Sequence, residues 1–234
     1  MATISLFKFE ESLPKQQIVN LIDGKKENGF WFRAKQSRFR ESEIEIDVWY
    51  EEDIEIGMNR VFSTDAVEIV QYLKENGKEK IVRKIYCFLD VEKKTLEIYR
   101  GYDGLTEKIK QQLEKMLATK FMAFSLSSNA LIKLVNEHSS ELKQVMFKYL
   151  HGLWYSIIRG RHLEKNEKYI SYLREKPESL RVVSIVPKIK YMSPKEYLVT
   201  VNGDKGTIKF AEGLFKWRPR FEVRQIIDII SLLG

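Results

Sequence analysis

The stretch YCFLDVEKKTLEIYRG at residues 86–101 aligns without gaps with LVTVNGDKGTIKFAEG at residues 198–213, an offset of 112 positions. In this alignment Thr95 falls on Thr207, and the alternating apolar residues that follow it fall on apolar residues. In both stretches, turn-forming residues separate two alternating runs, which is the pattern of a β-hairpin. The sequence therefore predicts two copies of one hairpin.

The order of the elements around each hairpin also recurs. The first copy has a strand, a helix, two strands, a helix, the hairpin and a helix, predicted at 3–9, 14–22, 30–38, 43–56, 64–75, 83–100 and 105–117. The second copy has a strand, a helix, two strands, a short helix, three strands and a closing helix; all but the last are predicted at 121–126, 128–137, 143–150, 154–159, 164–174, 182–191, 196–201 and 207–211. We therefore expect an α+β protein built from a tandem repeat of β-α-β4-α units, each with an extra helix between its middle strands.

Strand, helix, four strands and helix, repeated twice, resembles the fold of the TATA-binding protein family over most of the chain. The resemblance lies in the element order and not in a sequence motif. It implies an antiparallel sheet with helices on one face, which leaves the other face free for a partner. The two repeats would occupy residues 1–119, which include an acidic outer strand, and residues 120–234, which are basic.

The composition is that of a globular protein without covalent or metal crosslinks. An apolar content of 44% in 234 residues supplies a core, whereas one cysteine and three scattered histidines exclude a structural disulfide or zinc site. The cysteine, Cys87, lies in an alternating strand and is predicted to be a buried, inert thiol. The first residues have no secretory pattern and the chain has no long apolar run, so we expect a cytoplasmic protein that does not enter membranes. Abundant Lys and Glu with little Cys favour a thermophilic source.

Charge divides unevenly between the two repeats. Residues 1–119 hold 20 Lys and Arg against 22 Asp and Glu, a net charge of −2, whereas residues 120–234 hold 20 against 11, a net charge of +9. Such asymmetry suggests that the second half meets a polyanion. The alternative is a solvated surface with an excess of lysine.

The segment EIEIDVW, residues 43–49, alternates carboxylates with apolar residues, so that one strand face is core and the other is acidic. Cations of the preceding strand, such as Lys35, are expected to pair across the strands with these carboxylates. Eight acidic residues between positions 41 and 55 exceed those partners and argue against nucleic acid on this face. A basic protein partner at Glu43, Glu45 and Asp47 is one interpretation, and a solvated face is the other.

The sequence contains no established catalytic motif. It has no GxGxxG, no phosphate-binding GxxxxGK, no GxSxG and no HExxH. Glu92 and Lys94, with Asp90 upstream, match the letters of a nuclease metal site. They lie in a predicted hairpin turn, and we interpret the match as a coincidence. We therefore predict a protein that is not an enzyme and has no cofactor or metal.

The segment IIRGRHL, residues 157–163, ends a predicted strand with Arg159 and Arg161 on either side of a glycine, followed by His162. This spacing lets the backbone approach a phosphate while both guanidinium groups reach its oxygens. The alternative is a turn glycine with two surface arginines.

The segment FKWRPRF, residues 215–221, precedes the closing helix. Pro219 suits the first turn of a helix because the amide hydrogen that it lacks would have no partner there. Arg218 and Arg220 do not suit that position, since cations oppose the helix dipole by roughly 0.3–1 kcal/mol each. Residues that contradict the usual charge preference of a helix N-terminus often mark a functional site.

A bound anion would compensate for these arginines, because free amides, the helix dipole and Arg224 one turn later would form a phosphate site together. Lys216 and Trp217 would add charge and a surface for base stacking. The alternative is that Glu222 and a neighbouring carboxylate neutralise the arginines while Trp217 packs inside.

Two hypotheses of function follow. The first is a non-enzymatic protein that binds DNA or RNA mainly through phosphates, with strong salt dependence. Its predicted contacts are Arg159, Arg161, His162, Lys216, Trp217, Arg218, Arg220 and Arg224. The alternative is a protein interaction or assembly module, in a complex or as a homodimer, that uses the acidic 41–55 strand or an exposed sheet face.

Overall fold

The computed structural model describes residues 2–11, 14–38, 40–62, 66–101, 103–193, 195–211 and 220–234, except for the side chains of 2 and 60–62. Its strands are β1 (Ala2–Lys8), β2 (Lys26–Glu27), β3 (Phe30–Gln36), β4 (Glu43–Asp53), β5 (Lys80–Asp90), β6 (Thr95–Ile98), β7 (Met122–Ala123), β8 (Ser139–Leu150), β9 (Leu153–Arg159), β10 (Leu180–Pro187), β11 (Val199–Asn202) and β12 (Thr207–Phe210). Its α-helices are α1 (Lys15–Ile22), α2 (Ile54–Phe62), α3 (Val67–Glu75), α4 (Gly104–Leu117), α5 (Ser128–His138), α6 (Glu167–Glu175) and α7 (Arg220–Leu233).

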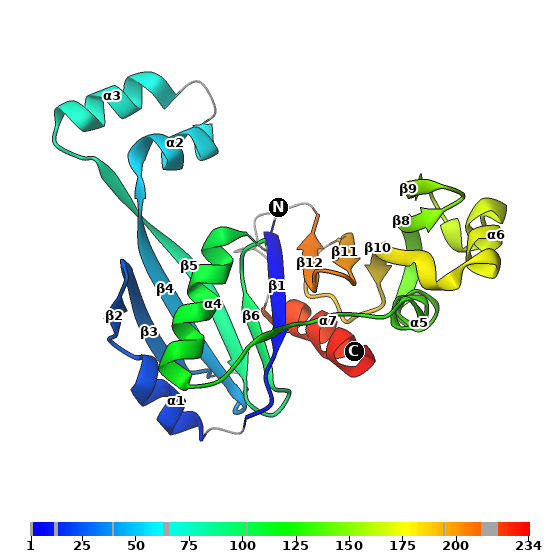
Figure 1. The fold of residues 1–234 in the computed structure, drawn as a ribbon, viewed down its shortest axis with the longest axis horizontal. Coiled ribbons are helices and arrows are strands. Elements are labelled where there is room, and N and C mark those ends of the chain that lie inside the picture. Colours follow the sequence, from blue (N-terminus) through cyan, green and yellow to red (C-terminus); the bar gives the residue numbers. More distant parts are fainter. Residues whose placement is uncertain are drawn as a thin grey trace.

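The strands of the described residues form one antiparallel sheet, which runs across both halves of the chain (Figure 1). Its order is β2-β3-β4-β5-β6-β1-β12-β11-β10-β8-β9, with β7 paired to β1 beside the end of β12. The predicted α+β class and antiparallel sheet are therefore confirmed. The two halves meet where β1 pairs with β6 on one side and with β12 on the other.

The two aligned stretches form hairpins with the same register. Cys87 pairs with Ile98 in the β5–β6 hairpin, and Val199 pairs with Phe210 in the β11–β12 hairpin, which is the same pairing displaced by 112 positions. The period-2 pattern and the turn residues determine this register locally, because a slip by one residue would turn every side chain to the other face. The predicted pair of hairpins is confirmed.

Strand β1 supplies side chains to two cores that lie on opposite faces of the sheet. Ile4 and Leu6 belong to the core formed with α5, α6 and α7, whereas Phe7 belongs to the core formed with α1 and α4. Successive residues of a strand point to opposite faces, so the two groups of helices pack on opposite faces as well. The expectation that helices cover one face only is wrong. Helix packing depends on long-range contacts that no local pattern encodes.

The halves also differ in where they carry insertions. The neighbours β3-β4-β5-β6 in the first half correspond in order to β8-β10-β11-β12 in the second. In the first half the insertion is α2 and α3, between β4 and β5, and in the second it is β9 and α6, between β8 and β10. The strand predicted at 43–56 ends at Asp53, because helix α2 begins at Ile54. The resemblance to the TATA-binding protein family stays a prediction.

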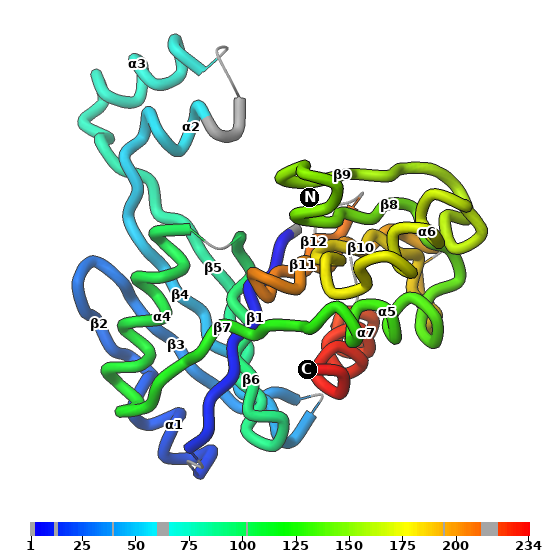
Figure 2. The backbone as a smooth tube through the Cα atoms, turned by 45° about the vertical axis from the view of Figure 1, so that its right-hand side comes forward, coloured from blue at the N-terminus to red at the C-terminus, as the bar shows by residue number. Residues whose placement is uncertain are grey.

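Helices α2 and α3 stand at the far ends of β4 and β5, away from the rest of the chain (Figure 2). We call residues 51–82 the arm. The arm is held together by a small cluster of its own, in which Ile54, Ala66 and Val70 are buried. Two helices of nine residues each on a two-stranded ribbon bury little apolar surface, so much of the apolar surface of the arm is exposed.

Candidate nucleic-acid interface

Arginines at the start of helix α7 belong to a buried cluster of ion pairs. Glu43, at the start of β4, is 1% exposed. Its carboxylate accepts hydrogen bonds from Arg224 Nε at 3.0 Å and from Arg220 Nη2 at 2.6 Å. Arg220 also pairs with Glu97 of β6 at 2.6 Å. Both guanidinium groups are therefore occupied by the protein's own carboxylates, and we do not assign Arg220 or Arg224 to an external phosphate.

The charge of Glu43 is stabilised by these arginines. Burial alone would raise the pKa of the Glu43 carboxyl, but hydrogen bonds and charges from Arg224 and Arg220 outweigh it and hold that pKa below its usual value. The alternative from the sequence, that carboxylates of the protein neutralise these arginines, is therefore correct for Arg220 and Arg224. The carboxylates are those of Glu43 and Glu97, and not that of Glu222. Glu222 instead accepts hydrogen bonds from the backbone amides of Met192 and Ser193, each at 2.6 Å.

The remaining predicted contacts at this helix start are Lys216, Trp217 and Arg218, which, like Pro219, lie outside the described residues.

Carboxylates of the acidic strand β4 form ion pairs with lysines of the neighbouring strands. Glu45 pairs with Lys35 at 2.9 Å, directly across from it in register, and Asp47 pairs with Lys84 at 2.8 Å. The expected cross-strand pairing is confirmed for Lys35. Because Glu43 is buried and its two neighbours are paired, we do not assign a basic partner protein to these three carboxylates.

The predicted cations at the end of β9 are on the surface. Arg159 and Arg161 are exposed, and neither has an ion pair with any residue that the structure describes. His162 has a left-handed backbone with φ of +50°, and its Nδ1 lies 3.0 Å from Glu164. Two free arginines therefore stand at the edge of the sheet, since β9 is its last strand.

Arg159 begins a polar row across the sheet, on the face opposite the second-half core. Through successive strand pairs the row runs through Arg159, Gln144, Ser184, Thr200, Lys209 and Thr3. Ser184 and Thr200 are hydrogen-bonded side chain to side chain at 2.7 Å. We call this face of β8 to β12 the open face, because the second-half helices α5, α6 and α7 all pack on the other one. On β10, however, Val182, Ser184 and Val186 are buried on this face as well.

The β8–β9 hairpin also carries exposed apolar side chains that the sequence analysis did not single out. Trp154 is 77% exposed, and Tyr149, Leu153, Tyr155 and Ile157 are exposed as well. The rings of Tyr149 and Trp154 are 5.9 Å apart. The signal was the run YLHGLWYSII, in which a turn lies between aromatic residues. A strand pattern predicts alternation, but it does not show that this hairpin extends beyond the helices.

Apart from Glu141 near the start of β8, the β8–β9 hairpin contains no carboxylate. Residues 142–161 contain four Lys and Arg and no Asp or Glu. Lys148 reaches outside this stretch to Asp204 at 2.5 Å, and Lys143 pairs with Glu141 at 2.5 Å. Arg159 and Arg161 have no ion pair with the part of the chain that the structure describes. Aromatic rings and guanidinium groups exposed on one hairpin can stack on flat groups and bind anions.

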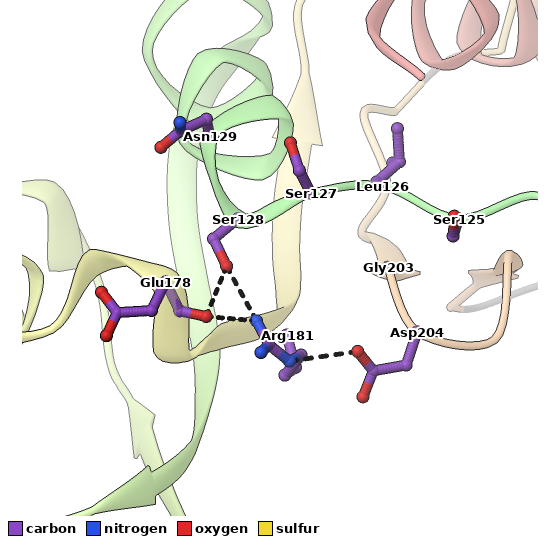
Figure 3. A pocket seen from close by; sticks show the side chains of 9 residues that line it. All are labelled: Ser125, Leu126, Ser127, Ser128, Asn129, Glu178, Arg181, Gly203 and Asp204. Carbon is purple, nitrogen blue, oxygen red and sulfur yellow. Dashed lines mark hydrogen bonds and ion pairs between the residues drawn. The ribbon is translucent and has the colours of Figure 1, made fainter.

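A pocket of about 500 Å³ lies at the start of α5, lined by Ser125, Leu126, Ser127, Ser128, Asn129, Glu178, Arg181, Gly203 and Asp204 (Figure 3). Its one cation, Arg181, pairs with Asp204 at 3.1 Å and donates to Ser128 Oγ at 2.8 Å. Ser127 caps the helix by accepting from the Ala130 amide at 3.2 Å. Because Arg181 is already bound by Asp204 and Ser128, we assign no ligand to this pocket.

Cys87 is buried, as predicted, and burial raises the pKa of its thiol. Within the described ranges, no three or more His, Cys, Asp or Glu side chains come together in a metal-binding arrangement. Asp90 Oδ1, from the nuclease-like letters, accepts from the backbone amides of Glu92 and Lys93, which is the role of a turn residue.

No protein-family model matches the sequence, and no curated protein is significantly similar to it. Across the part of the chain that the structure covers, no helix has the length and apolar character needed to cross a membrane.

Proposed function

We propose that the protein binds single-stranded nucleic acid, without catalysis, through the β8–β9 hairpin and the open face beside it. The observation that carries the proposal is the combination of exposed aromatic side chains with the unpaired Arg159 and Arg161, in a hairpin that holds no carboxylate between residues 142 and 161. The net charge of +9 in the second half supports it, because a positive field raises the local concentration of a polyanion.

The aromatic side chains favour a single strand over a duplex. In a duplex the faces of the bases are stacked on one another, whereas unpaired bases stack on Tyr and Trp for about 1–3 kcal/mol each. Trp154 and Tyr155 are adjacent in an antiparallel strand, so they present rings to both sides of the hairpin. Bases on either side of the hairpin would find a surface for stacking.

The cations would bind phosphates. Arg159 points to the open face, and Lys209, also exposed, lies in the same polar row four strands away. A strand that stacks on the hairpin would cross the sheet along this row. Between the two cations, Gln144 and Thr200 are partly exposed, whereas Ser184 is buried and hydrogen-bonded to Thr200. None of the three side chains bears a negative charge.

Salt titration of binding tests the phosphate contacts. We would measure fluorescence anisotropy of a labelled single-stranded oligonucleotide across salt concentrations, for the wild type and for Arg159→Glu/Arg161→Glu. Affinity should fall steeply with salt for the wild type. Loss of two phosphate contacts should make the slope of log K against log[salt] shallower by about 1.4, since each contact contributes roughly 0.7 for a single strand.

The matched control is Lys26→Glu/Lys108→Glu, which makes the same change in net charge on exposed lysines of the first half. It should leave the slope close to the wild-type value. Equal losses in both double variants, or wild-type binding that does not respond to salt, would contradict the proposal.

A further inference from the structure

The arm is the second surface of the chain with exposed apolar side chains, and its charge is opposite to that of the hairpin. Tyr72 is 65% exposed, and Ile56, Val67, Ile69 and Val82 are exposed too. Residues 51–82 hold eight Asp and Glu against four Lys and Arg, a net charge of −4. A projecting, acidic and apolar surface of this kind is typical of an interaction site.

A groove of about 480 Å³ runs between α2 and α3 of the arm. Glu55 and Glu75 line it together with Val67 and Val70. Lys74 is the one cation among the described residues of the lining, and it pairs with Glu55 at 2.5 Å. The groove therefore offers apolar contact within an acidic rim, and it suits an occupant that is both apolar and basic.

The chain itself carries such an occupant. Residues 139–181, which contain the β8–β9 hairpin and α6, hold nine Lys and Arg against five Asp and Glu, a net charge of +4, beside the exposed aromatic side chains of the hairpin. Figures 1 and 2 show the arm and the hairpin on different sides of the molecule. In both views the described parts of the arm and of the hairpin are separated from each other within one copy of the chain.

We propose that the arm of one copy docks on the β8–β9 hairpin of a second copy, in a head-to-tail contact. The contact brings segments with net charges of −4 and +4 together, and it buries the exposed apolar side chains of both surfaces. Because it joins two different surfaces, a pair of copies keeps one free arm and one free hairpin, and association continues to longer oligomers or closes into a ring.

The contact has a consequence for ligand binding that rests on the proposed function. The arm places carboxylates where that function places phosphates, and it covers the aromatic side chains that would stack on bases. Single-stranded nucleic acid and a second copy therefore compete for the hairpin, and binding of one displaces the other.

Sedimentation velocity of the full chain across protein concentrations tests the contact in the absence of nucleic acid. The wild type should associate with rising concentration, and more weakly at moderate than at low salt. Val67→Lys/Tyr72→Lys in the arm and Trp154→Glu/Tyr155→Glu in the hairpin should each weaken association by roughly tenfold or more. The control Leu232→Lys changes a side chain that is 87% exposed on α7, and it should associate like the wild type.

Mixing the two variants separates a head-to-tail contact from a symmetric one. The hairpin variant keeps an intact arm and the arm variant keeps an intact hairpin, so their equimolar mixture should form a heterodimer that stops at two copies. A wild type that stays monomeric at low salt, an arm variant that associates like the wild type, or a mixture that forms no heterodimer would each overturn the inference. Circular dichroism melts verify that every variant is folded.

Nucleic-acid binding is read out separately from association. The arm variant leaves the hairpin intact and should bind the oligonucleotide at least as tightly as the wild type, and the oligonucleotide should dissociate wild-type oligomers. If the oligonucleotide binds nothing while the variants still complement each other, the proposed function fails and the contact stands. If the oligonucleotide binds but no association occurs, the contact fails and the function stands.

Discussion

Arg224 and Glu43 lie 181 positions apart in the sequence and form a buried ion pair, with Arg224 Nε 3.0 Å from Glu43 Oε2. The pair joins helix α7 to strand β4, and so it holds the second half of the chain against the first. Arg220 strengthens the same junction, because its guanidinium carbon lies 3.9 Å from the centroid of the Phe88 ring.

Removal of the Glu43 charge should strongly destabilise the protein. In Glu43→Gln, Arg224 and Arg220 lose their shared carboxylate while they remain buried, and a buried pair broken in this way costs about 3–5 kcal/mol. Urea unfolding measures the change in free energy. The control is Glu45→Gln, which removes a partly exposed pair with Lys35 and should cost no more than about 1 kcal/mol. Similar losses in both variants would contradict a dominant role for the buried cluster.

The stability of the protein should fall in acid because of the same carboxylate. The pKa of Glu43 is below its usual value in the folded state, so its contribution is complete above the unfolded-state pKa of about 4.3. The contribution is lost as the pH falls through the lower, folded-state pKa. Thermal unfolding between about pH 2 and pH 7 should therefore show that the difference in stability between the wild type and Glu43→Gln is constant above about pH 4.3 and shrinks as the pH falls below that value. A difference that grows in acid would have the wrong sign.

Asp228 of α7 should add to this acid sensitivity. Burial opposes its ionisation, but hydrogen bonds from Arg40, at 2.6 Å, and Lys93 hold the pKa of the Asp228 carboxyl below its usual value. The stability of the double variant Glu43→Gln/Asp228→Asn should therefore fall less in acid than the stability of Glu43→Gln alone. Parallel pH profiles for the single and the double variant would show that Asp228 contributes nothing.

Trp154→Ala should weaken binding of single-stranded nucleic acid without changing its salt dependence. The change removes a stacking surface worth about 1–3 kcal/mol, whereas the phosphate contacts of Arg159 and Arg161 remain. Anisotropy titrations at several salt concentrations should give parallel lines for the variant and the wild type. Trp31→Ala, a change in β3 of the first half, is the control for loss of a tryptophan and should leave affinity unchanged.

Gly206→Ala should destabilise the β11–β12 hairpin far more than Gly152→Ala destabilises the β8–β9 hairpin. Both glycines have positive φ, of +57° and +73°, so each substitution carries a backbone cost of roughly 1–2 kcal/mol. A Cβ at Gly206 would also lie 2.0 Å from the Phe124 carbonyl oxygen, whereas a Cβ at Gly152 meets nothing within 4 Å. Equal unfolding free energies for the two variants would mean that the close approach at Gly206 relaxes without cost.

Local patterns were sufficient to predict the hairpins. The register of β5–β6 recurs in β11–β12 because alternation and turn chemistry act over a few neighbouring residues, and both were visible in the aligned stretches. The amphipathic helix α4 was equally visible, since Asp103 caps it by accepting from the Thr106 amide at 2.9 Å. Helix α2 was missed, because its residues 54–56 continue the strand alternation that precedes them.

The candidate site was only half visible in the sequence. Arg159 and Arg161 were predicted from their spacing, and the structure places both on the surface. Arg220 and Arg224 were predicted from the same type of reasoning, but Glu43 and Glu97, far away in the chain, bind them. A cation in a sequence carries no information about a carboxylate more than a hundred positions away.

The sequence by itself determined the α+β class, the two hairpins and the acidic and basic halves, because these depend on periodicity, turn chemistry and charge counts within short stretches. The tertiary structure alone decided that the two groups of helices lie on opposite faces, that α7 packs on the acidic strand, and that Trp154 is exposed. Each of these three depends on which distant surfaces meet, and the free energy of that choice comes from burial and ion pairing between segments far apart in the chain.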